Sequence, residues 1–128
     1  MACSDTSEPS NDLVTSEGRW EDARFGSYAF TAERSCFCTE EGRGPVRITV
    51  RNGAITTATM VATGASVNGA VWFTIDGLFD LIREQMETLP SRLVVEYDRE
   101  LGYPTKIEYG TPENDGGGII YIRGLVRE

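Results

Sequence analysis

The sequence contains no histidine, a single lysine (Lys106) and only three cysteines. Without histidine, a serine nucleophile would lack its commonest general base, so the usual hydrolase triads are excluded. Zinc would also lack its imidazole ligands, and no second cysteine pair replaces them. The formal net charge is −8. Because binding to nucleic acid depends on clustered lysine and arginine, we do not expect nucleic acid to be a partner.

The chain also lacks any apolar run of about 18 residues, so no membrane-spanning segment is expected, and no signal peptide is recognised near Met1. A small residue precedes Cys3, and a polar tract rich in Ser, Thr, Glu and Pro follows it. This pattern is typical of a bacterial lipoprotein whose signal has been replaced by a start methionine. Cys3 would then carry lipid, and residues 1–15 would be a flexible tether. A disordered start with an incidental cysteine is the alternative.

Residues 16–128 have the length of one domain, and their hydrophobic periodicity predicts an α+β fold. A short helix is expected over 16–24, with Ser16 as its N-cap. Alternating apolar residues predict strands over 28–38, 46–50, 54–61, 93–97, 105–109 and 119–126. We therefore expect an antiparallel sheet of about six strands, with one long amphipathic helix packed on one face and a short N-terminal helix.

The long helix is predicted over 74–89, where apolar residues recur at the spacing of one buried face. These residues are Ile75, Leu78, Phe79, Ile82, Met86 and Leu89. Thr74 is the expected N-cap, and Pro90 ends the helix. Trp72 and Phe73 precede the cap and suggest either a hydrophobic staple in the core or an exposed binding edge, of which core packing is favoured.

The Asn52-Gly53 pair is the strongest hairpin signal in the sequence, but it leaves the register open. A two-residue turn would place Val50 opposite Ile55. A three-residue turn with a bulge would place Val50 opposite Ala54 instead. In the strand over 28–38, one parity is apolar except for Arg34, which is interpreted as a bulge or an exposed strand end.

Cys36 and Cys38 allow several kinds of chemistry. Two strand residues rise about 6.6 Å, close to the limit for the Cα atoms of a disulfide, so a bond between them would need a kinked backbone. Its small ring would contribute at most about 1.6 kcal/mol. A redox dithiol, a metal site completed by Glu40 and Glu41, and two free core thiols are the alternatives. A disulfide is favoured if the domain is exported.

Two acidic pairs are formal candidates for carboxylate hydrolysis, namely Asp98 with Glu100 and Glu113 with Asp115. Both pairs lie in predicted turns, where acidic residues usually shape the backbone or face water. The segment 113–116 also faintly suggests calcium, but it lacks the ligand pattern of an EF-hand loop. No catalytic residue, metal or cofactor is therefore assigned.

Four segments together resemble a bacterial family of unknown function (DUF6174), whose members look like small secreted proteins and lipoproteins. The segments are 36–38, 46–53, 74–79 and 97–105. The most specific part is the turn motif of Tyr97, Asp98, Gly102, Tyr103 and Pro104. The resemblance implies an envelope protein lipidated at Cys3, and it implies no activity.

The sequence thus favours a non-enzymatic, extracytoplasmic domain, tethered to the membrane only through Cys3, that binds another component of the cell envelope or serves as an accessory module. The alternative is a small redox or metal-handling protein that uses Cys36 and Cys38. Neither interpretation names a ligand or an oligomeric state.

Overall fold

The computed structural model describes residues 9–23, 25–35, 43–88, 93–109 and 118–128. Within these ranges it contains two α-helices, one 3₁₀ turn and six β-strands. In chain order the elements are α1 (Pro9–Ala23), β1 (Ser27–Ser35), β2 (Val46–Arg51), β3 (Ala54–Met60), η2 (Gly69–Val71), α3 (Ile75–Thr88), β4 (Val94–Tyr97), β5 (Pro104–Tyr109) and β6 (Gly118–Arg127).

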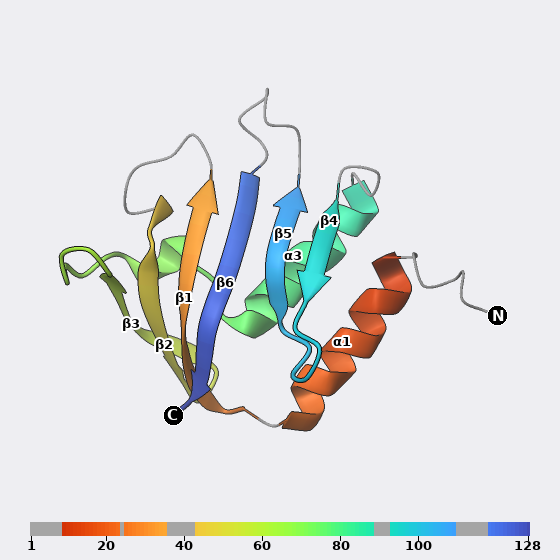
Figure 1. Cartoon of the computed structure of the whole chain (residues 1–128), viewed down its shortest axis with the longest axis horizontal. Helices are drawn as coiled ribbons and strands as arrows, with labels where there is room; N and C mark the ends of the chain where they lie inside the picture. The colour runs from red at the N-terminus through yellow and green to blue at the C-terminus, as the bar shows by residue number, and fades with distance from the viewer. Residues whose placement is uncertain (1–8, 24, 36–42, 89–92, 110–117) are drawn as a thin grey trace.

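The strands form one sheet in the order β3-β2-β1-β6-β5-β4 (Figure 1). All five neighbouring pairs are antiparallel. The strand latest in the sequence, β6, therefore lies in the middle of the sheet between β1 and β5. The predicted α+β class and the six-stranded antiparallel sheet are confirmed.

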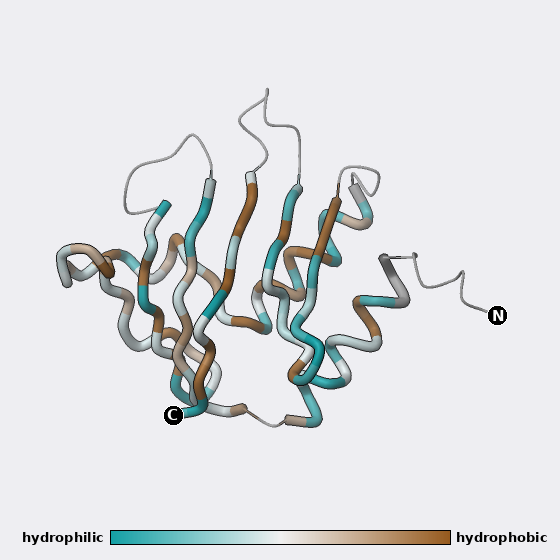
Figure 2. Tube along the Cα trace, in the orientation of Figure 1, coloured by the Kyte–Doolittle hydropathy of each residue, from teal (hydrophilic) through white to brown (hydrophobic). Residues whose placement is uncertain are grey.

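The helices share one hydrophobic core with the sheet. In Figure 1, α3 crosses behind the strands and α1 lies beside β4. Hydrophobic and hydrophilic stretches alternate along the strands (Figure 2), as expected for a sheet with one covered face. Four side chains of α3 are almost completely buried in this core, and each contributes about 1.5–3 kcal/mol before entropy. They are Ile75, Leu78, Phe79 and Ile82.

The first helix differs from the prediction, because α1 already begins at Pro9. The expected tether over residues 1–15 is therefore wrong from Pro9 onward, and the part before Pro9 lies outside the described residues. Ser16, the predicted N-cap, lies inside the helix and is buried. The physical reason is Leu13, which packs in the core on the same helical face as Trp20. A polar composition around Leu13 concealed this contact.

The start of α3 agrees with the sequence. The Thr74 hydroxyl accepts a hydrogen bond from the Gly77 N–H at 3.0 Å, which confirms Thr74 as the N-cap. The hydroxyl of Tyr28 in β1 accepts a second one from the Ile75 N–H at 2.9 Å. Two of the unpaired N–H groups at the helix start are thereby satisfied. The helix end predicted at Leu89 lies outside the described residues.

The hairpin between β2 and β3 has the two-residue turn that the sequence allowed, and the three-residue alternative, with Val50 opposite Ala54, is not found. The Asn52-Gly53 turn has two residues with positive φ, 53° and 82°, and it places Val50 opposite Ile55. The register then shifts at a β-bulge that leaves Thr56 out of the pairing. Because of this bulge, Ala58 returns to the covered face and is buried.

Candidate functional site

The cysteines that the sequence singled out, Cys3, Cys36 and Cys38, lie outside the described residues. The lipid anchor and the disulfide therefore stay predictions. The acidic candidates of segments 40–41 and 113–115 also lie outside the described residues.

Asp98 shapes the turn between β4 and β5. Its Oδ2 atom accepts hydrogen bonds from the N–H groups of Glu100 at 3.1 Å and Leu101 at 2.8 Å. The backbone closes the same turn, because Asp98 N–H donates to the Tyr103 carbonyl and Gly102 N–H donates to the Asp98 carbonyl. The carboxylate is thus engaged with the backbone, as is usual for aspartate in turns.

This turn packs directly against α1 at Gly102. The residue has a φ of +84°, and a Cβ atom placed on it would lie 2.0 Å from the Ser16 carbonyl oxygen and 2.9 Å from Arg19 Cβ. The next residue, Tyr103, places its ring edge-on to Trp20 with the centroids 6.3 Å apart. The glycine is therefore required both for its backbone conformation and for this close approach.

Tyr97 and Pro104 anchor the two ends of the turn in the core. The Tyr97 ring stacks on Phe79 with the centroids 6.3 Å apart, and Pro104 is completely buried. Burial, reinforced by the negative charges of Asp12 and Glu17, raises the pKa of the Tyr97 hydroxyl. That hydroxyl is buried without a hydrogen-bond partner among the described residues. Every described member of the turn motif thus has a structural contact.

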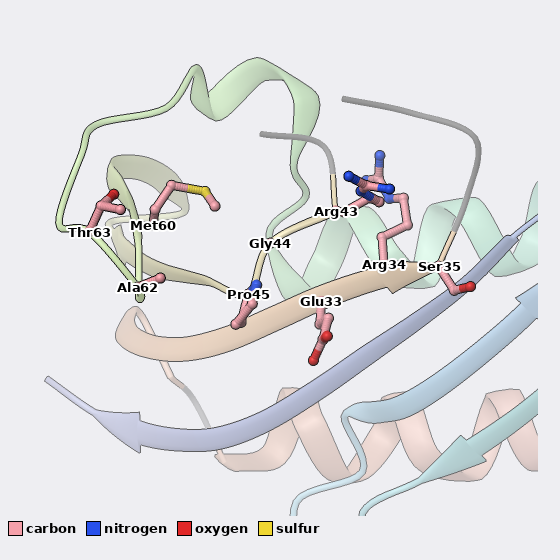
Figure 3. Close-up of a pocket in the computed structure, with 9 residues that line it drawn as sticks. All are labelled: Glu33, Arg34, Ser35, Arg43, Gly44, Pro45, Met60, Ala62 and Thr63. Carbon is pink, nitrogen blue, oxygen red and sulfur yellow. The ribbon is translucent and has the colours of Figure 1, made fainter. Parts of the chain in front are cut away.

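A pocket of about 580 Å³ lies where β1 ends, β2 begins and β3 ends (Figure 3). Its volume falls within the range of about 300–1,000 Å³ that is usual for small-molecule sites. One wall is closed by hydrogen bonds from Val61 N–H to the Pro45 carbonyl and from Gly64 N–H to the Met60 carbonyl. The described lining residues are Glu33, Arg34, Ser35, Arg43, Gly44, Pro45, Met60, Ala62 and Thr63.

Arg34 is the most constrained polar residue of this pocket. Its guanidinium carbon lies 4.7 Å from the ring centroid of Trp72 and 5.9 Å from that of Phe73. Its Nη2 atom donates to the Val71 carbonyl at 3.0 Å. The Nε atom is buried and has no partner within the described part of the chain. Burial disfavours the charged form and lowers the pKa of Arg34.

The interpretation of Arg34 as a bulge or an exposed strand end is wrong. The residue is half-buried, and the irregularity of β1 lies between Ala29 and Thr31 instead. Trp72 is buried, in keeping with the favoured core role. The available signal was a cation at an apolar position of the strand. What the sequence could not show is that an aromatic pair distant along the chain would receive it.

Arg43 adds a second cation, because it lines the pocket from the segment before β2. It is exposed and has no partner among the described side chains. Gly44 positions this segment: a Cβ atom there would lie 2.8 Å from the Ala32 carbonyl oxygen, and its φ is +80°. The one acidic residue in the described lining, Glu33, points away from both arginines in Figure 3 and pairs with Arg123 at 3.2 Å. The described charge of the pocket is therefore positive.

Within the described ranges, no three side chains of cysteine, aspartate or glutamate gather as a metal ion would require. Neither described helix is long and apolar enough to cross a membrane.

Fold and pocket together define an α+β domain with a basic pocket at one end of an antiparallel sheet. Residues 12–115 match the model of a family of unknown function (DUF6174), and the chain belongs to that family. This confirms the resemblance found in the sequence. No curated protein and no solved structure matches the chain. The matched residues end before β6, so the central strand of the sheet lies outside them.

Proposed function

We propose that this protein is a non-enzymatic binding domain of the cell envelope, held outside the cytoplasm by a lipid on Cys3, and that the pocket is its binding site. The pocket is the observation that carries the binding role, because three chain segments build it and the cations Arg34 and Arg43 line it. The anchor is supported by the sequence around Cys3, where a polar tract follows the cysteine.

Binding fits this pocket better than acid–base catalysis. Arginine stays protonated near neutral pH, so Arg34 and Arg43 are suited to attract and orient a ligand but not to exchange protons with it. Asp98, a candidate acid in the sequence, is engaged by two backbone N–H groups in the β4–β5 turn.

A thermal-shift panel tests the binding role. Small anionic, cationic and neutral compounds are added to the wild type, to Ala62→Trp and to the control Thr57→Trp, which places the same side chain on an exposed residue outside the described pocket lining. A class of compound that raises the Tm of the wild type and the control, but not that of Ala62→Trp, supports the proposal. If no class raises the Tm of the wild type, the pocket is not a binding site.

The anchor and the cysteine pair need a separate experiment. Intact-mass analysis of the protein from its own envelope fraction should show lipid on Cys3, and an unmodified Cys3 would overturn the anchor. Thiol titration in a graded redox buffer distinguishes the alternative function. A midpoint potential for Cys36 and Cys38 near that of the glutathione pool, or stoichiometric bound metal, would favour a redox or metal-handling protein.

A further inference from the structure

The charges around the pocket contrast with those of the rest of the molecule. Each of α1 and α3 carries four acidic residues and one basic residue, and the chain as a whole has a net charge of −8. The pocket nevertheless places Arg34 and Arg43 on the same side of β1 (Figure 3). Its acidic neighbour Glu33 is already paired with Arg123. No described acidic group therefore neutralises the two guanidinium groups from within the pocket.

Arg34 is also held in advance of binding. The Trp72 ring supports one face of its guanidinium, and the hydrogen bond to the Val71 carbonyl fixes its rotation. A half-buried cation that has lost part of its hydration gains more from an anion than a fully hydrated surface arginine does. Little side-chain entropy remains to be lost when a ligand binds.

Deepening the proposed function, on which this inference rests, we propose that the pocket binds a small organic acid through its carboxylate or phosphate group. Arg34 and Arg43 hold the oxyanion, because guanidinium groups match the geometry of both anions. The apolar part of the ligand lies against Met60, Pro45 and Ala62, which line the same pocket.

The overall negative charge does not prevent this binding. At physiological ionic strength, charges separated by more than about 8 Å in water are largely screened from each other. None of the acidic side chains of α1 and α3 is among the described residues that line the pocket, whereas Arg34 and Arg43 are. The local pair therefore decides the sign of the ligand, and the net charge mainly slows its approach.

Titration calorimetry of the folded protein with benzoate, phenyl phosphate and the neutral analogue benzamide tests this inference. The variant Arg43→Gln removes the exposed cation of the pocket, and Arg99→Gln removes the charge of an exposed arginine in the β4–β5 turn as a matched control. Losing one charge-assisted contact should weaken anion binding about tenfold or more in Arg43→Gln. Arg99→Gln should bind as the wild type does.

The outcomes distinguish failure of the proposed ligand class from failure of the proposed binding function. Binding of benzoate or phenyl phosphate that exceeds benzamide binding and is lost in Arg43→Gln supports the inference, and the tighter of the two anions identifies carboxylate or phosphate. Benzamide binding as tight as that of the anions leaves a binding pocket but overturns the anion. An equal loss in Arg43→Gln and Arg99→Gln also overturns it. Failure of every compound in the thermal-shift panel would remove the proposed function as well.

Discussion

Gly102 lies in close contact with α1, so the substitution Gly102→Ala tests directly whether the β4–β5 turn packs against this helix. The added Cβ atom would stand 2.0 Å from the Ser16 carbonyl oxygen. Backbone, not a movable side-chain end, occupies that position, so either the turn or the helix must shift. The substitution also forces a residue with a Cβ atom to keep a φ of +84°.

The cost has two parts. A left-handed conformation costs a non-glycine residue about 1–2 kcal/mol. Forcing extra volume into a packed contact typically costs about 1–3 kcal/mol more. We therefore expect Gly102→Ala to lower the free energy of unfolding by about 2–5 kcal/mol, a large share of the total stability of a typical domain.

Gly53→Ala provides the matched control. Gly53 has a nearly identical φ of +82°, and nothing lies within 4 Å of the position its Cβ atom would take. Gly53→Ala should therefore lower the free energy of unfolding only by the conformational part. The effect of alanine on the unfolded chain is the same in both variants and cancels when they are compared. Urea unfolding followed by circular dichroism measures both. If the losses agree within about 0.5 kcal/mol, Gly102 does not contact α1 as described.

Three further predictions follow from the core. Tyr28→Phe should cost about 1–3 kcal/mol, because the Ile75 N–H loses its buried acceptor, whereas Tyr97→Phe should leave stability unchanged or raise it. Urea titrations compare the two variants, and equal losses would contradict the assignment of the Tyr28 hydrogen bond. Burial raises the pKa of Tyr28 from its ordinary value of 10.0 to about 12. The unfolded chain therefore releases this proton first, and the stability held below pH 10.0 should be lost as the pH rises toward about 12. Denaturation followed together with tyrosinate absorbance checks this, and constant stability across that window would contradict it. Phe79→Ala should cost about 3–5 kcal/mol in the same urea assay, since its ring is fully buried, and a loss below 1 kcal/mol would refute that packing.

Local signals predicted much of the fold. The Thr74 cap, the apolar stripe of α3 and the Asn52-Gly53 turn depend on residues only a few positions apart, so the sequence shows them directly. The hairpin register was harder to predict. A bulge such as that at Thr56 depends on which face packs against the helices, and that is a property of the assembled core.

Long-range contacts account for what was missed. Leu13 draws a polar segment into helix α1 because the core receives it, and composition alone could not reveal that contact. The pocket was missed for the same reason. The role of Arg34 depends on its contact with Trp72, which lies far away in the sequence. In the sequence, a residue whose contacts are distant is visible only as an exception to the local pattern, such as an apolar residue in a polar segment or a cation at an apolar position of a strand.

The central place of β6 has a consequence for how the chain acquires its structure. The β1–β2–β3 unit and the β4–β5 hairpin share no strand pairing, so the sheet is continuous only when β6 lies between them. The ion pair of Glu33 with Arg123 joins residues 90 positions apart, a separation typical of slowly folding topologies. Because synthesis starts at the N-terminus, the strands of both parts of the sheet are made before β6, the strand that joins them. The sheet can therefore be completed only after the residues of β6, up to Arg127, have been made.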